Sequence, residues 1–161
     1  MTYFRAVDPF PLESADQNKL SAFYEYLAAG RLVTTACAGC RRMDWPPRAF
    51  CPECGSDRYE WVDLPHEGTI HAFSVQETGI PAGFERPLIF AVVKVADLRL
   101  FVRLVETDPA AVAVGGRVRF TPIRVAPDST GAPRYLPAFR LFSSPLPTEG
   151  GEGEPAGGGQ G

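Results

Sequence analysis

The sequence predicts a mainly β protein with an N-terminal helical segment, a metal-binding ribbon and a small antiparallel β-barrel of the OB type. The ribbon follows from the cysteines, which all fall in two C-x-x-C pairs between Cys37 and Cys54. The barrel follows from the short β-branched and aromatic runs after them, which are separated by Gly, Pro or Asp. No βαβ rhythm interrupts these runs, which favours antiparallel strands closed into a barrel.

Four segments are predicted along the 161 residues. The last of them is rich in Pro, Gly and Glu, a composition typical of disorder. The segments are 1–30, an N-terminal arm and amphipathic helix; 31–58, the metal ribbon; 59–142, the OB-fold barrel with a C-terminal arm; and 143–161, a disordered tail.

Composition limits the classes of function. Apolar residues make up 45% and charged residues 22% of the chain, which is enough for a packed core. No apolar run approaches the roughly 20 residues of a membrane span, and the N-terminus lacks the layout of a signal peptide. We therefore expect a cytoplasmic protein without membrane contact, whose thiols stay reduced. The net charge of −3 disfavours a general nucleic-acid binder.

A helix is expected over 14–30. Ser14 with Gln17 fits a capping box, and Gly30 fits the C-terminal end. Apolar side chains at helical spacing form one stripe, which must be buried either on this chain or on a partner. Both alternatives are open, and the stripe is the predicted partner-binding site: Leu20, Phe23, Tyr24 and Leu27.

Short strands are expected on both sides of the cysteines. The run 31–36 leads into Cys37, and the ribbon is expected to end near Asp57. Asp108 and Pro109 predict one helical turn before the last regular strand. The runs predicted as barrel strands are 68–79, 87–97, 98–106 and 117–125, and 134–142 is either one more strand or an arm.

One strand carries a candidate ligand or partner face. Apolar and other side chains alternate along 98–105, which places Arg99, Phe101 and Arg103 on one side. OB barrels bind single-stranded nucleic acid with strand aromatics flanked by cations. The same face could instead meet an acidic partner or the phosphates of a nucleotide-bearing thioester, or be no more than a solvated outer face.

The cysteine spacing C-x2-C-x10-C-x2-C predicts a metal site. Two such turns bring four thiolates around one ion with tetrahedral geometry, which suits Zn²⁺ or Fe. Four protein ligands leave no open position, so we expect a structural Zn²⁺; an iron site with an electron-carrying role is the alternative. Gly55 fits a left-handed position in the second turn, whereas the first turn has Gly39 inside it. The predicted ligands are Cys37, Cys40, Cys51 and Cys54.

Other features of the sequence argue against independent catalysis. The metal takes all the cysteines, and the two histidines, His66 and His71, are too few for a second metal site. No nucleophile elbow, phosphate loop or dinucleotide-binding glycine motif is present. We therefore predict no catalytic residue and place the function in binding. Between the cysteine pairs, Trp45, Pro46, Pro47 and Phe50 are expected to pack over the metal loop.

The order of these parts resembles a known family. The stretches "GRLVTTACAGC", "WPPRAFCPECGS", "EGTIHAFSV", "PLIFAVVKV" and "VAVGGRVRFTPI" carry the resemblance. They are similar to proteins with a rubredoxin-like zinc ribbon and a C-terminal OB fold, once catalogued as domain of unknown function 35. A departure is the "KVADLRL" turn, which lacks the glycine often found there.

The resemblance implies an accessory subunit of an acyl-CoA enzyme that does no chemistry of its own. Such subunits bind thiolase-like proteins (thiolases, aldolases and synthases), and some accompany hydratases. They stabilise the catalytic partner and shape its acyl-CoA site. One subgroup serves benzoylsuccinyl-CoA thiolases and another serves steroid side-chain aldolases. Only the four cysteines carry over residue by residue.

Overall fold

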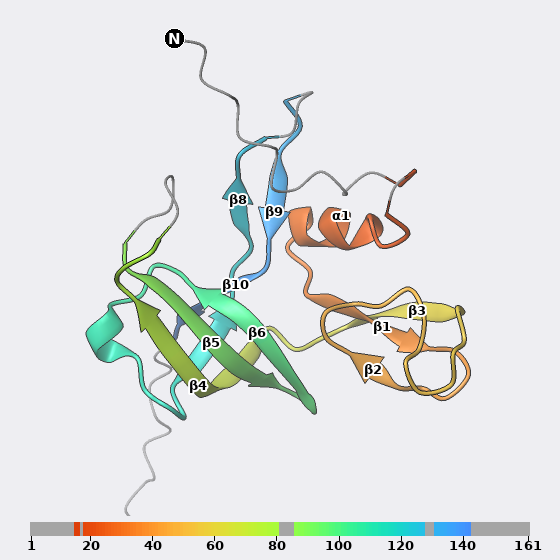
Figure 1. Cartoon of the computed structure of the whole chain (residues 1–161), viewed down its shortest axis with the longest axis horizontal. Coiled ribbons are helices and arrows are strands. Elements are labelled where there is room, and N and C mark those ends of the chain that lie inside the picture. The colour runs from red at the N-terminus through yellow and green to blue at the C-terminus, as the bar shows by residue number, and fades with distance from the viewer. Residues whose placement is uncertain (1–14, 17, 81–85, 128–130, 143–161) are drawn as a thin grey trace, which may run out of the picture.

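The computed structural model describes residues 15–16, 18–80, 86–127 and 131–142. A closed barrel lies on one side of the molecule and a small ribbon on the other, with a helix and a two-stranded arm above them (Figure 1). No helix in the described ranges is long and apolar enough to cross a membrane.

Helix α1 runs over Ala22–Ala28 and is shorter than the helix predicted over 14–30. Before it, the side chain of Asn18 accepts a backbone N–H at 2.9 Å and forms a turn that is not helical. Gly30 follows the helix with φ of +73°, as expected at a helix C-terminus. The predicted capping box of Ser14 and Gln17 lies outside the described residues.

The ribbon is a three-stranded antiparallel sheet with the order β2-β1-β3. Its strands are β1 (Val33–Cys37), β2 (Met43–Asp44) and β3 (Tyr59–Asp63). Strand β3 pairs with β1 and not with the barrel, so this strand, which follows the predicted boundary at residue 58, lies in the ribbon sheet. All residues of β1 are buried, so this central strand needs a partner on each edge.

The barrel is closed by five strands in the order β10-β6-β5-β4-β7, which confirms the predicted OB-type architecture. All neighbouring pairs are antiparallel except β6 with β10, which are parallel. The parallel pair arises because the chain leaves the barrel after β7 and returns along β6. The strands are β4 (Glu67–Gln76), β5 (Leu88–Val95), β6 (Leu98–Leu104), β7 (Arg117–Phe120) and β10 (Ala138–Leu141).

Two predicted strands are each split by a proline. Pro122 separates β7 from β8 (Ile123–Val125), and Pro137 separates β9 (Arg134–Leu136) from β10. Proline has no N–H for a strand ladder, so each run ends and the chain changes direction. The strands β8 and β9 pair as a separate antiparallel arm. Before β7, the predicted turn is the short helix η1 (Pro109–Ala111), in which the Asp108 carboxylate accepts a backbone N–H at 3.0 Å.

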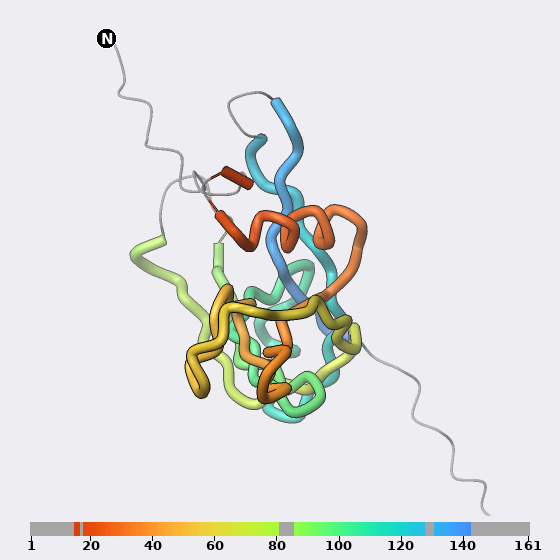
Figure 2. The backbone as a smooth tube through the Cα atoms, turned by 90° about the vertical axis from the view of Figure 1, so that its right-hand side faces the viewer, coloured from red at the N-terminus to blue at the C-terminus, as the bar shows by residue number. Residues whose placement is uncertain are grey.

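Helix α1 packs against β9 of the arm and β1 of the ribbon, so it links these two parts of the chain. Seen from the ribbon side, it lies across the base of the arm (Figure 2). One hydrophobic cluster runs from the helix through the barrel. It includes Phe23, Leu27 and Val33 as well as barrel residues such as Leu100 and Phe139. The helix is therefore part of the folded core of this chain.

Candidate functional site

Two loops with one backbone pattern present the cysteines. In the first loop, Cys37 N–H donates to the Arg42 carbonyl at 2.8 Å, and Arg41 N–H donates to the Cys37 carbonyl at 2.9 Å. The loop that starts at Cys51 repeats both bonds at 2.8 and 2.9 Å. The fifth residue of each loop is left-handed, with φ of 64° at Arg41 and 70° at Gly55. The sequence revealed this position only in the second loop, because the first uses an arginine there.

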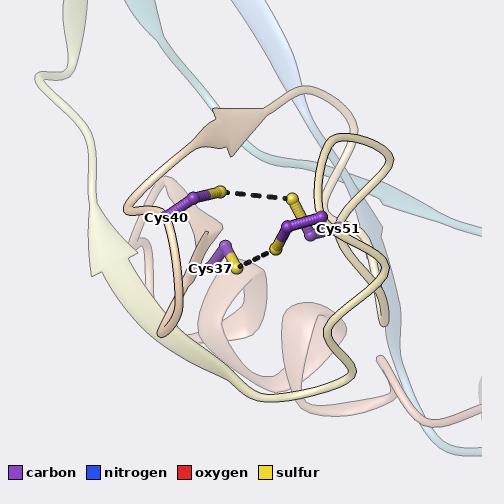
Figure 3. A group of neighbouring side chains, drawn as sticks. Cys37, Cys40 and Cys51 are labelled. Atoms are coloured by element: carbon purple, nitrogen blue, oxygen red, sulfur yellow. Dashed lines mark hydrogen bonds between the residues drawn. The ribbon is translucent and has the colours of Figure 1, made fainter.

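The four sulfurs converge between these loops (Figure 3). The Sγ atoms of Cys37 and Cys54 are 3.6 Å apart, those of Cys40 and Cys51 are 3.5 Å apart, and all four lie within 4.8 Å of one another. A tetrahedral ion with metal–sulfur bonds of about 2.3 Å needs sulfurs about 3.8 Å apart. The predicted cysteine group therefore has a metal-binding arrangement.

The thiols differ strongly in pKa. The backbone N–H of Cys40, together with that of Gly39, lowers the pKa of Cys37 to about 6. For Cys40, the N–H of Arg42 acts to lower the pKa, but the neighbouring thiols and burial raise it to about 12. The Cys37 thiol therefore loses its proton readily, but a second thiolate beside it is unfavourable because the two negative charges repel each other. A cation at the centre removes this conflict, which is the electrostatic reason that such a cluster favours a metal.

Ion pairs brace the two loops from outside. The guanidinium of Arg42 pairs with Asp44 of β2 at 3.1 Å and with Glu53 of the other cysteine loop at 3.0 Å. Arg41 pairs with Glu60 of β3 at 3.4 Å. These pairs are solvent-exposed and individually weak, but they tie both cysteine loops to the same sheet.

The side chains between the cysteine pairs only partly cover the metal loop. Trp45 is half-buried and contacts Phe23 edge-on at 5.8 Å, and Pro47 is buried. Pro46 is exposed, and Phe50 is 62% exposed. The predicted cover of four side chains is therefore wrong for Pro46 and Phe50, because Trp45 turns to the helix and leaves the tip of the loop open.

The predicted partner-binding stripe of α1 is mostly internal. Phe23 is 8% exposed and Leu27 is fully buried in the core of this chain. These two side chains are buried on this chain, which was one of the two alternatives for the stripe, and they offer no surface to a partner. Leu20 and Tyr24 are half-buried, and a partner-binding role stays a prediction for them.

The predicted face of β6 is formed on the outside of the barrel. Arg99 is exposed, Phe101 is 66% exposed and Arg103 is half-buried. Strand β5 adds two residues that the sequence analysis missed. Phe90 stacks on Phe101, with ring centroids 5.5 Å apart and planes at 11°, and Lys94 faces Arg99 in register. The tight β5–β6 hairpin, with φ of 49° at Ala96, fixes this register. The turn between the two strands is the feature of the sequence that could have revealed these two neighbours.

The described residues contain no cluster of groups suited to catalysis. Every cysteine belongs to the metal-binding group. His66 is exposed and lies edge-on to Phe120 at 5.3 Å, and His71 is exposed on β4. Neither has a described nucleophile or carboxylate within hydrogen-bond distance.

The fold and the cysteine group together define a zinc-ribbon and OB-fold protein. The chain matches the "ChsH2, rubredoxin-like zinc ribbon domain" over 25–60 and the "ChsH2, C-terminal OB-fold domain" over 61–121. The chain belongs to the ChsH2 (DUF35) family, as its sequence motifs predicted.

Relatives of known structure or curated name support this placement. A chain of the solved Ltp2–ChsH2 (DUF35) aldolase is 28% identical, with a TM-score of 0.65 over 76% of this chain and 93% of that chain. A DUF35 protein of unknown function from Sulfolobus solfataricus shares the fold, with 14% identity, a TM-score of 0.51, and coverage of 75% of this chain and 83% of that chain.

A curated relative, the probable enoyl-CoA hydratase alpha subunit of Thermomonospora curvata, is 28% identical over 137 residues. The alignment covers 84% of this chain and 40% of that relative. The chain therefore spans about two fifths of the length of the curated relative.

Proposed function

We propose that this chain is a non-catalytic accessory subunit of a heteromeric enzyme that processes acyl-CoA. The observation that carries the proposal is the 28% identity to a chain of the Ltp2–ChsH2 aldolase over 93% of that chain's length. The relative named as an enoyl-CoA hydratase alpha subunit also supports an acyl-CoA substrate. The lack of a catalytic cluster among the described residues fits a subunit whose partner performs the chemistry.

The partner is a thiolase-like catalytic subunit, either a thiolase or an aldolase. The family resemblance supports this choice, and it allows a benzoylsuccinyl-CoA thiolase as one specific case. In the complex, the chain stabilises the partner and shapes its acyl-CoA site. A hydratase partner is the second candidate, because of the curated name of the Thermomonospora relative.

The metal is a structural Zn²⁺ held by the four cysteines. The closed set of four thiolates supports this role, because no position is left for substrate or water. The metal holds the cysteine loops at one end of the ribbon, opposite the end where the chain leaves for the barrel (Figure 1). A cytoplasmic location would keep these thiols reduced.

Co-expression with the enzymes encoded next to this chain tests the proposal. The tagged chain should retain one large subunit, and the pair should turn over an acyl-CoA ester that neither protein turns over alone. Three assays separate the partners: thiolysis of a 3-ketoacyl-CoA, retro-aldol cleavage of a 3-hydroxyacyl-CoA and hydration of a 2-enoyl-CoA. Full activity of the large subunit alone would refute the accessory role.

The metal is tested on the purified chain by elemental analysis and absorption spectra. A colourless protein with one zinc per chain supports the structural site. Iron with visible thiolate absorption would instead support an electron carrier.

A further inference from the structure

An exposed aromatic platform lies on the outer face of the β5–β6 hairpin. Phe101 is 66% exposed, and Phe90 stacks against its ring at 5.5 Å. Phe101 faces Val92 in register, so its diagonal neighbours on β5 are Phe90 on one side and Lys94 on the other. Because Phe90 already holds the Phe101 ring, a second flat group can stack there at little cost in side-chain entropy.

Two cations stand beside this platform. Lys94 and Arg99 face each other directly in the β5–β6 register, and both are exposed. Within the described part of the chain, neither makes an ion pair. Like charges directly opposite each other destabilise a sheet. The exposed ring and the facing cations are both unfavourable in the free chain, and both become favourable under a planar, negatively charged ligand.

We propose that this platform binds the nucleotide end of the acyl-CoA, with adenine stacked on Phe101 and the phosphates at Lys94 and Arg99. The inference rests on the proposed function, which supplies the acyl-CoA. The strands β5 and β6 are the second and third strands of the barrel, the face on which OB folds bind oligonucleotides and oligosaccharides. Base stacking on an aromatic flanked by cations is the same mode of binding.

A single nucleotide fits this surface better than a nucleic-acid strand does. A strand needs a row of cations along its backbone. The platform offers one facing pair of exposed cations, with Arg103 half-buried on the other side of the rings, and the net charge of the chain is −3. One coenzyme A carries a 3′-phosphate and a diphosphate close to one adenine, which matches one ring and two cations. A large protein interface, at about 800 Å² per partner, would need far more than these two rings.

The test is a titration of the full metal-loaded chain with coenzyme A, followed by NMR signals of the phenylalanine rings. The Phe101 signals should shift and saturate. The Phe50 signals should not, although Phe50 is 62% exposed on the ribbon. The probe 3′,5′-ADP should compete for the site, and pantetheine, which lacks the nucleotide, should not.

Variants of exposed residues test the contacts without disturbing the core. Phe101→Ala should weaken coenzyme A binding roughly 5- to 150-fold, the range of one base-stacking contact, and Phe101→Tyr should retain it. Lys94→Gln combined with Arg99→Gln should weaken binding and flatten its salt dependence. Phe50→Ala and Arg124→Gln are the matched controls, because Phe50 and Arg124 are exposed elsewhere, and both should bind as the unchanged chain does.

Three outcomes would overturn the proposal. The first is the absence of a saturable Phe101 shift at millimolar coenzyme A, or an equal response to pantetheine. The second is tighter binding of an oligothymidylate than of coenzyme A, which would assign the platform to nucleic acid. The third is loss of partner assembly in Phe101→Ala with coenzyme A binding unchanged, which would assign it to the partner surface.

The proposed function and this site fail separately. Coenzyme A binding at Phe101 without acyl-CoA turnover in any co-purified complex would support the proposed site and refute the proposed function. Acyl-CoA turnover in a complex whose coenzyme A binding and KM are unaffected by Phe101→Ala would support the proposed function and refute the proposed site.

Discussion

Replacing Phe23 with alanine separates the two roles that helix α1 could have. Phe23 is 8% exposed and contacts Tyr24 and Trp45 edge-on at 5.5 and 5.8 Å. Truncation of a buried phenylalanine costs about 3–5 kcal/mol. We expect about 3 kcal/mol here, because the ring lies at the edge of the core beside half-buried neighbours.

Urea unfolding of the metal-loaded chain, followed by tryptophan fluorescence, measures this loss. With a slope of about 2 kcal/mol/M, the midpoint should fall by about 1.5 M. Leu20→Ala is the control in the turn just before this helix, because Leu20 is only half-buried, and its midpoint should change much less.

The result that refutes the core role of α1 is equally clear. If Phe23→Ala left the urea midpoint unchanged but abolished retention of the large subunit, the side chain would act at the partner surface. The expected result is the opposite: stability falls, and the folded fraction of the variant still binds the partner.

Three further predictions concern the metal, the barrel and pH. Cys51→Ser should remove the metal and unfold the ribbon, seen as loss of zinc and of the ribbon amide signals, whereas Phe50→Ala should keep both. Gly68→Ala should destabilise the chain by about 1–3 kcal/mol, because the added Cβ would lie 2.6 Å from the Lys94 carbonyl oxygen; Gly39→Ala, whose added Cβ meets no atom closer than 3.7 Å and whose φ is not left-handed, separates this clash from ordinary glycine loss. Hydrogen bonds from Arg119 and Arg117 lower the pKa of Glu67, so its contribution to stability is complete above the ordinary carboxylate pKa of about 4.3 and is lost as pH falls below it. The stability difference between the unchanged chain and Glu67→Gln, compared at pH 7 and pH 3, should therefore shrink in acid; a difference that grows would contradict this sign.

The sequence predicted the parts of this structure that depend on spacing. The cysteine group follows from two C-x-x-C turns, and the alternation along β6 follows from the pleat of a strand. The turn at Asp108 follows from a capping side chain and a proline. In each case the determining residues are close in the chain, so local rules were sufficient.

The parts that were missed depend on contacts between distant residues. The assignment of β3 to the ribbon depends on its pairing with β1, which no local pattern near Tyr59 indicates. The parallel pairing of β10 with β6 likewise needs the path of the whole chain. The platform on β5 and β6 requires the register of the hairpin, because Phe90 and Phe101 become neighbours only after the strands pair.

Two misses were local and could have been recognised. Pro122 and Pro137 each end a strand, and both were visible within runs read as continuous. The left-handed Arg41 was hidden, because an arginine rarely occupies that conformation. In the structure Arg41 occupies the same position as Gly55, because the two cysteine loops share one backbone pattern.

The most direct test of a non-catalytic role is acyl-CoA turnover by the co-purified complex after both histidines of this chain are replaced. His66→Gln combined with His71→Gln removes the only imidazoles in the sequence, and both side chains are exposed, so the fold should persist. We predict an unchanged kcat and a partner that still co-purifies. A large fall in kcat with an intact complex would contradict the accessory role and place part of the catalytic site on this chain.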